Sequence, residues 1–193
     1  MVKSNATNSK IVAPKKPKTG LNPMQEIKVE KITLNIGTGK DQVLLEKAQK
    51  LLNTITGVSS VRTVTQKRIA AWGLRPGLPI GVKVTLRKDK ALALIPRMLY
   101  AKDMKLATNN FDDNGNVSFG MKEYIDIKDA RYDPDIGSMG LQCSITLARP
   151  GSRIKVRKVL KRAIPIHHRV SKVDAIQFMK KNFGVILASD EEE

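Results

Sequence analysis

The chain is poor in several residue types, and each shortage excludes a class of protein. Cys143 is the only cysteine in 193 residues, so an intramolecular disulfide and a multi-cysteine zinc site are both excluded. Because Cys143 alternates with Leu141, Ile145 and Leu147, we expect it in the core. No apolar run approaches the ~20 residues of a membrane helix, and no apolar segment follows the N-terminal lysines as in a secretory signal. We therefore expect a soluble intracellular protein without a membrane partner, a metal or another cofactor.

Catalytic motifs are also missing, and we expect no enzyme. The segment Gly37–Lys40 differs from a phosphate-binding P-loop, because Leu34 stands where that motif requires glycine and Asp41 where it requires serine or threonine. We interpret it as a glycine turn between a strand and a helix, whose free N–H groups can hold a nucleic-acid phosphate. His167 and His168 have no partner set for metal binding or nucleophilic catalysis. Aromatic residues amount to only 4%, which argues against a base-stacking platform.

Acidic residues are scarce, and the shortage is local. The chain has 35 Lys and Arg against 18 Asp and Glu, a net charge of +17. Residues 47–88 and 136–173 each contain nine basic and no acidic residues, whereas residues 89–135 contain nine acidic and seven basic ones. Such a charge favours a polyanionic partner, and the candidates are nucleic acid, an anionic membrane surface or an acidic protein. Segregation of the charge predicts a binding face rather than general solubility.

Composition divides the chain into three parts. Residues 1–20 are rich in Lys, Ser, Asn and Pro, which predicts a disordered basic tail. Residues 21–187 have the patterning of a single folded domain, and residues 188–193 form an acidic tail. With 41% hydrophobic residues in the chain, the domain can bury a sizeable core.

Periodicity predicts an α+β fold. Alternating patterns indicate strands over residues 28–37, 61–71, 80–87, 116–127 and 140–147. Apolar stripes indicate helices over 41–55 (Leu44, Ala48, Leu51, Leu52, Ile55), over 89–101 (Leu92, Ile95, Met98, Leu99, with Pro96 restarting or kinking it), and from Ser171 or Lys172 to Gly184. The last helix has a capping-box pattern in Ser171 and Asp174. We expect a mostly antiparallel sheet with helices packed on one face and an RNA-binding face on the other.

Two predicted strands have a polar row opposite an apolar one. These rows are Lys31, Thr33 and Asn35 in one strand, and Lys83, Thr85 and Arg87 in the other. If the strands share a sheet, the rows form a donor-rich surface suited to phosphates and 2′-hydroxyls across an RNA minor groove. The loop Trp72–Leu78 contains one aromatic residue, two leucines and an arginine. Either Trp72 anchors this loop in the core or the loop contacts a second macromolecule.

Several segments together resemble a known family. They are ITLNIGTG at 32–39, AAWGLRPGLPIGVKVTLR at 70–87, FDDNGNVSFGMKEYIDI at 111–127 and GLQCSITLARPGSR at 140–153. With these blocks the chain resembles the universal large-subunit ribosomal protein L5 family over residues 21–187. The RPG block followed by a basic segment is similar to the archaeal and eukaryotic branch, and the archaeal type is expected.

The resemblance implies a structural protein of the large ribosomal subunit in the cytoplasm, which binds 5S rRNA in the central protuberance. Further implied partners are 23S-type rRNA, P-site tRNA, neighbouring central-protuberance proteins and a small-subunit head protein across an intersubunit bridge. The resemblance assigns Asn35, Lys67 and Thr85 to the 5S rRNA face. Together with the polar strand rows, the predicted 5S rRNA-binding residues are Lys31, Thr33, Asn35, Gln66, Lys67, Arg68, Lys83, Thr85 and Arg87. The loop implied to reach P-site tRNA is Gly73, Leu74, Arg75, Pro76, Gly77 and Leu78. Additional rRNA contacts are expected from Arg153, Lys155, Arg157, Lys158, Lys161, Arg162, His167, His168 and Arg169.

Two other functions stay open at this point. A general RNA- or DNA-binding module outside the ribosome would show little preference for 5S rRNA over unrelated duplex RNA. A nucleotide-hydrolysing enzyme that uses Gly37–Lys40 would turn over ATP or GTP.

Overall fold

The structure is a computed structural model that describes residues 22–128 and 130–188. The basic tail expected over residues 1–20 lies outside the described residues, as do residues 189–193 of the expected acidic tail. Ala188, which we assigned to that tail, is instead the last residue of a strand. Within the described ranges, no helix has the length and apolarity needed to cross a membrane.

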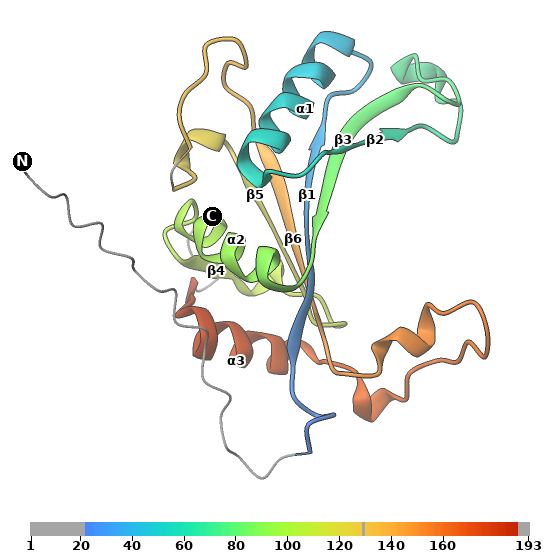
Figure 1. Cartoon of the computed structure of the whole chain (residues 1–193), viewed down its shortest axis with the longest axis vertical. Helices are drawn as coiled ribbons and strands as arrows, with labels where there is room; N and C mark the ends of the chain where they lie inside the picture. Colours follow the sequence, from blue (N-terminus) through green and yellow to red (C-terminus); the bar gives the residue numbers. More distant parts are fainter. Residues whose placement is uncertain (1–21, 129, 189–193) are drawn as a thin grey trace, which may run out of the picture.

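A five-stranded antiparallel sheet forms the centre of the molecule (Figure 1). Its strand order is β2-β3-β1-β6-β5. The strands span Val61–Val64 (β2), Pro79–Leu86 (β3), Lys28–Gly37 (β1), Leu141–Ala148 (β6) and Asn116–Met121 (β5). β1 is the middle strand, and its Leu34 pairs with Val84 on one side and Cys143 on the other. The predicted strands therefore do share one sheet.

Three helices complete the α+β fold: α1 (Gln42–Thr56), α2 (Lys88–Tyr100) and α3 (Lys172–Phe183). Figure 1 shows α1 and α2 on the same side of the sheet. Alternate side chains of β1, β3, β5 and β6 face these helices and form one buried cluster with them. Cys143 belongs to this cluster, and burial raises the pKa of its thiol to about 12, which leaves it un-ionised at neutral pH. The prediction that Cys143 is a core residue is confirmed.

The predicted helix faces are largely right, with one error in each of the first two helices. In α1 the buried residue is Leu45, and Leu44 is exposed. In α2 the exposed residue is Leu92, while Ala91 and Leu94 are buried. Both errors arise because a stripe that recurs every three or four residues allows two neighbouring faces, and only packing against the sheet selects one.

Pro96 does not end α2, which continues through it to Tyr100. The proline lies on the exposed side of the helix. There water can hydrogen-bond the carbonyl of Leu92 that the missing N–H would have served. The expected restart of the helix at Pro96 is therefore wrong.

Two predicted strands are shorter than expected. β2 ends at Val64, and the chain then forms a loop with a 3₁₀ turn at Ala70–Trp72. The backbone of this loop forms hydrogen bonds across the loop rather than along a β-ladder. The Thr65 N–H donates to Leu78 O at 2.9 Å, and the Gly77 N–H donates to Thr65 O at 2.9 Å. β5 likewise ends at Met121. A third feature had no predicted counterpart, since β4 (Lys105–Ala107) pairs in parallel with β7 (Ile186–Ala188).

The start of α3 confirms the predicted capping box. The Asp174 N–H donates to Ser171 Oγ at 3.2 Å, and the Ser171 N–H donates to Asp174 Oδ2 at 3.3 Å. Two donors of the first helical turn are thereby satisfied. Ala175 and Met179 of α3 are fully buried.

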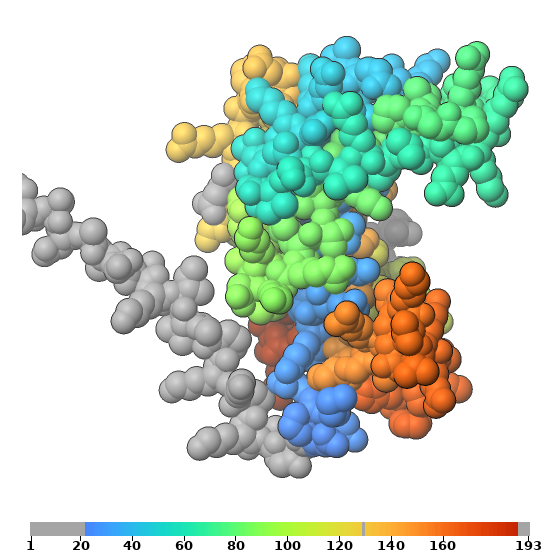
Figure 2. Space-filling view, turned by 45° about the vertical axis from the view of Figure 1, so that its right-hand side comes forward, coloured from blue at the N-terminus to red at the C-terminus, as the bar shows by residue number. Residues whose placement is uncertain are grey.

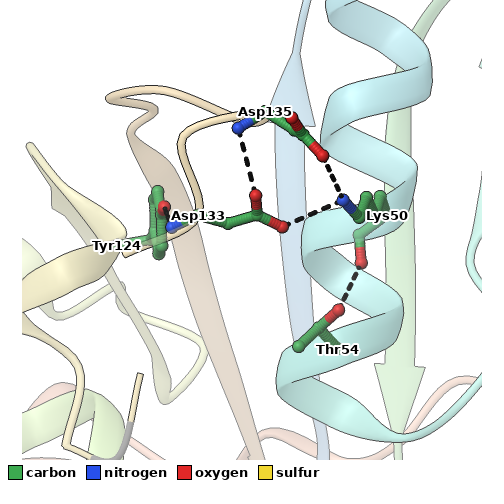
Figure 3. Close-up of polar contacts among 5 residues, drawn as sticks. All are labelled: Lys50, Thr54, Tyr124, Asp133 and Asp135. Carbon is green, nitrogen blue, oxygen red and sulfur yellow. Dashed lines mark hydrogen bonds and ion pairs between the residues drawn. The ribbon is translucent and has the colours of Figure 1, made fainter. Parts of the chain in front are cut away.

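A polar contact holds the loop between β5 and β6 against α1 (Figure 3). Lys50 Nζ lies 2.9 Å from Asp133 Oδ2 and 3.3 Å from Asp135 Oδ2. The Asp133 N–H donates to Tyr124 Oη at 3.0 Å. The hydrogen bond from Lys50 lowers the pKa of Asp133, and the bonds to Asp133 and Asp135 raise the pKa of Lys50. This contact lies on the helix side of the sheet.

Candidate nucleic-acid interface

The second face of the sheet, away from α1 and α2, is polar. Strand register aligns its side chains into rows: Asn35 pairs with Lys83 and Gln142, and Thr33 pairs with Thr85 and Ser144. We call this surface the open face. It consists of Lys31, Thr33, Asn35, Lys83, Thr85, Ser118, Gln142, Ser144 and Thr146.

The open face consists mainly of hydroxyl and amide groups, with two lysines and no carboxylate. Asn35 Nδ2 donates to Gln142 Oε1 at 3.2 Å, and Ser118 Oγ donates to Ser144 Oγ at 3.1 Å. These cross-strand bonds orient the side chains and leave further donors and acceptors available to a ligand. A flat surface of this kind can match the hydroxyls and phosphates of an RNA minor groove.

Close approach of the strands under the open face depends on Gly81 in β3. A Cβ atom at this position would lie 2.6 Å from Ile36 O and 3.1 Å from Thr63 Oγ1. The distance to the backbone oxygen of Ile36 is too short for a Cβ, so the strands would have to separate, whereas the Thr63 side chain would need to shift only slightly. Gly120 in β5 pairs with Gln142 and has no such neighbour within 4 Å.

The sequence analysis found only part of the open face. It placed Lys31, Thr33, Asn35, Lys83 and Thr85 there, and the register confirms that they lie together. Arg87 is one residue beyond β3, and its Nη1 is 3.9 Å from Glu30 Oε1. The sequence analysis missed four residues of the open face: Ser118, Gln142, Ser144 and Thr146. The alternation of β6, with Leu141, Cys143, Ile145 and Leu147 inward, already contained the signal for its polar residues.

The loop between β2 and β3 projects from one end of the sheet. Gln66, Lys67 and Arg68 are exposed in this loop and do not lie on a strand, contrary to prediction. Trp72 is 68% exposed and does not anchor the loop, whereas Leu74 is only 7% exposed. Reciprocal backbone bonds between Ile69 and Leu74, of 3.0 and 3.1 Å, close the tip. Of the predicted tip residues Gly73–Leu78, Gly73, Arg75, Pro76 and Gly77 are exposed.

The glycine turn at Gly37–Lys40 does not offer the predicted anion site. The N–H groups of Thr38 and Gly39 both donate to Ile80 O, at 3.0 and 3.1 Å. Neither N–H is free for a phosphate, because the turn uses them to join β1 to β3. The expectation of free N–H groups at these two residues was wrong.

Residues 151–169 form a second projection, which we call the basic arm. It carries all nine predicted rRNA-contacting residues, and all of them are exposed except the half-buried His168. Figure 1 shows the β2–β3 loop and the basic arm extending from opposite ends of the sheet, both away from α1 and α2. In Figure 2 the surface between these two projections is set back. The cations of the β2–β3 loop and of the basic arm therefore lie on one side of the molecule, whereas Lys50 of the first acid-free window lies on the helix side.

Arg149, at the end of β6, fastens the root of the basic arm. Its Nη1 donates to His167 O at 3.1 Å and its Nη2 to Asp174 Oδ2 at 3.1 Å, and its side chain is only 17% exposed. His168 Nε2 lies 2.9 Å from Pro150 O. These bonds tie together the residue that follows β6, the end of the arm and the start of α3. We did not predict this role, because it depends on partners distant in sequence.

No cluster of three or more His, Cys, Asp or Glu suited to a metal occurs among residues 22–128 and 130–188. The structure places the polar open face between two exposed projections, the β2–β3 loop and the strongly cationic basic arm.

Known proteins are similar to this one in sequence over most of the chain. Residues 22–75 match the family model for ribosomal protein L5, and residues 79–178 match the model for the C-terminus of the same ribosomal family. The large ribosomal subunit protein uL5 of Sulfurisphaera tokodaii is 45% identical over 168 residues, 86% of this chain and 95% of that protein. Its namesake from Sulfolobus acidocaldarius is 45% identical over 166 residues, 86% of this chain and 93% of that protein. That of Thermoplasma volcanium is 44% identical over 166 residues, 86% and 98% of the two chains.

Proposed function

The chain belongs to the ribosomal protein L5 family, in its archaeal type, and we propose that its open face binds 5S rRNA and attaches it to the central protuberance of the large subunit. Family membership makes the protein a structural, rRNA-binding constituent of the cytoplasmic large ribosomal subunit and not an enzyme. The identity of the RNA and of the residues that hold it is our proposal.

One observation supports the proposal above the others. The polar side chains of four strands align by register into an acid-free surface, of which Asn35, Thr85 and Ser144 are typical. Hydroxyl and amide groups hydrogen-bond the 2′-hydroxyls, sugars and base edges of a shallow RNA minor groove. Lys31 and Lys83 add cations for the flanking phosphates. The expected recognition is by RNA shape rather than by base sequence.

Loss of single contacts on this face tests the proposal. Asn35→Ala or Thr85→Val should weaken 5S rRNA binding by about 1–3 kcal/mol, the scale of a lost buried hydrogen bond. Thr54→Val is the matched control, because Thr54 lies in α1 and bonds the carbonyl of Lys50 at 2.9 Å. Filter-binding titrations give the affinities, and thermal unfolding checks that each variant is folded. Unchanged affinity would remove these residues from the site.

Competition separates this proposal from a general nucleic-acid-binding module. Labelled 5S rRNA is titrated with unlabelled 5S rRNA, unrelated duplex RNA or DNA of the same sequence. The proposal predicts that only 5S rRNA competes well, with the DNA weakest because it lacks 2′-hydroxyls. Equal competition by unrelated duplex RNA would favour the general module.

The β2–β3 loop is proposed to contact P-site tRNA through the tip Gly73–Leu78. Exposed Arg75 supplies a cation there, and Trp72 presents an aromatic face beside it. Arg75→Ala should leave 5S rRNA binding intact and weaken tRNA binding in the P site of ribosomes assembled with the variant. Loss of 5S rRNA binding would contradict this separation of roles.

The basic arm is proposed to contact 23S-type rRNA. The arm extends away from α1 and α2 (Figure 1), and its cations are exposed, so they take no part in the core. Neighbouring central-protuberance proteins and a small-subunit head protein across an intersubunit bridge complete the proposed partners, without residues assigned to them.

A further inference from the structure

The outer part of the basic arm exposes aliphatic side chains as well as cations. Val159 is 71% and Leu160 73% exposed, and Val156 is exposed to a similar degree. We call these three residues the apolar turn. The turn is closed by its own bonds, since Arg157 Nε donates to Leu160 O at 2.9 Å and the Arg162 N–H donates to Ile154 O at 3.3 Å. Its aliphatic side chains are therefore displayed on an ordered backbone rather than buried.

The backbone of Leu160 adds a second observation. Its φ of 52° lies in the left-handed region, which disfavours a residue with a Cβ relative to glycine. Glycine would form this turn without that cost. The side chain of Leu160 offsets the cost only if something packs against it.

Charge around the apolar turn identifies the kind of partner. Arg157 and Lys158 precede Val159 and Leu160, Lys161 and Arg162 follow them, and all four cations are exposed. No acidic residue occurs in the basic arm. A molecule that covers the apolar turn must therefore also accept four cations. A second copy of this chain, which carries the same charge, is disfavoured, and a polyanion is favoured.

We propose that the apolar turn packs against unpaired nucleotides of ribosomal RNA, with the four flanking cations on the adjacent phosphates. A regular RNA duplex presents phosphates and hydroxyls to the outside and hides its base faces in the stack. Aliphatic side chains find an apolar surface only where bases are unstacked. The inference deepens the proposed contact of the basic arm with rRNA and rests on it.

Arg149 makes such an insertion possible by fixing the root of the arm. Its bonds to His167 O and Asp174 Oδ2 join the arm to α3, while Arg149 itself follows directly on β6. The apolar turn therefore has a defined position relative to the open face. An arm held in place loses less conformational entropy on binding than a free one.

Affinity measurements test the apolar contact. Val159→Ser with Leu160→Ser should weaken binding to a 23S-type rRNA transcript about tenfold, the change expected when two aliphatic side chains, each about half buried in the interface, are lost. The slope of log affinity against log salt should not change, because no phosphate contact is lost. Val43→Ser with Leu44→Ser is the matched control, since this is an exposed Val–Leu pair on α1. Unchanged affinity of the arm variant, or an equal loss in the control, would overturn the proposal.

Leu160→Gly separates the side chain from the turn. Glycine accepts the left-handed backbone, so the folded arm should be at least as stable. Binding to the same transcript should nevertheless weaken about threefold, because the packed side chain is gone. Equal or tighter binding would mean that only the turn geometry matters.

Cross-linking identifies what covers the turn. A photo-reactive benzoylphenylalanine at position 159, in large subunits assembled with the variant, should cross-link to rRNA nucleotides outside regular helices. A cross-link to a ribosomal protein, to a second copy or to helical RNA would overturn the proposal. Thr85→Val should not alter this cross-link in assembled subunits, so failure of the 5S rRNA proposal and failure of this one give different results.

Discussion

The open face and the basic arm both lack acidic residues, yet they are built in opposite ways. On the open face, the sheet register sets the spacing of the side chains, and cross-strand bonds such as Asn35 to Gln142 orient them. Most of its groups are uncharged. In the basic arm nearly every side chain is exposed, and the cations stand on turns fastened at the root by Arg149.

Under the proposed function, the two surfaces would recognise RNA by different physics. Uncharged groups at fixed spacing give contacts that depend on shape and depend weakly on salt. Exposed cations release counterions from RNA, and their contribution falls steeply as salt rises. The sheet would then supply selectivity for a folded RNA, and the arm would supply affinity for any RNA that lies within its reach. Variants of the two regions should therefore differ most clearly in salt dependence.

The largest effect is expected when the arm loses its outer cations. Replacing Arg157, Lys158, Lys161 and Arg162 with glutamine should reduce the magnitude of the salt slope for a 23S-type rRNA transcript by about 0.7 for each lost contact with a phosphate of unpaired nucleotides, or about 2.8 in all. The affinity deficit relative to the unchanged protein should then shrink about 50-fold between about 50 and about 200 mM salt. Titrations at several salt concentrations measure it. Thr85→Val should instead give a line for 5S rRNA parallel to that of the unchanged protein. Parallel lines for the arm variant would abolish the distinction between the regions.

The next effect concerns the packing beneath the open face. Gly81→Ala should destabilise the protein by about 2–3 kcal/mol, because its Cβ would lie 2.6 Å from Ile36 O and the strands must separate. Gly120→Ala is the control, since it lies on the same face with nothing within 4 Å. Urea unfolding of the two variants measures the difference. Equal stability of both variants would mean that the strands can move, and that the sheet register does not fix the spacing of the side chains on the open face.

Sequence patterns account for the geometry of the open face better than for the fastening of the arm, for a physical reason. A strand repeats every two residues, so Ile32, Leu34 and Ile36 on one side imply Thr33 and Asn35 on the other. Their pairing partners in β6 follow the same alternation, so the sequence contained the signal for these residues too. Local periodicity therefore carried nearly all the information that the open face required.

Features that depend on distant partners left no such pattern. The β4–β7 pair joins three residues near position 106 to three near position 187, which no local signal indicates. Arg149 acts through His167 and Asp174, 18 and 25 residues away. The chain after Val64 reads as a strand, but its hydrogen bonds run from Thr65 across to Leu78 and close a loop. In each case tertiary bonding decided what local propensity left open.

A smaller effect is expected at the root of the arm. Arg149→Met should speed tryptic cleavage within residues 151–169 and weaken binding to the 23S-type transcript about fivefold, because an unfastened arm pays more conformational entropy on binding. Arg62→Met is a control, since the Arg62 Nε bonds the Gln49 side chain at 3.0 Å on the helix side. In the background of the four-glutamine variant, the effect of Arg149→Met on affinity should vanish. An equal loss in both backgrounds would mean general destabilisation rather than fastening of the arm.

The smallest effect belongs to a charged contact outside both surfaces, the one between Lys50, Asp133 and Asp135 (Figure 3). The hydrogen bond from Lys50 lowers the pKa of Asp133 below its ordinary value of 3.8. A carboxylate whose pKa is lower in the folded state stabilises the fold above its unfolded pKa, and this contribution is lost as pH falls through the folded pKa. Because the pKa of Lys50 is raised in the folded state, the contribution of Lys50 to folding stability is complete below pH 10.5 and is lost only as the pH rises beyond that value. Lys50→Met should therefore lower stability slightly and evenly at neutral pH, and the difference from the unchanged protein should disappear in acid, as the pH falls through the lowered pKa of Asp133. Urea midpoints across this range measure it, and RNA affinity at neutral pH should not change. A loss of RNA binding in this variant would mean that charge on the helix side also contributes, and the division between an uncharged open face and a cationic arm would then be incomplete.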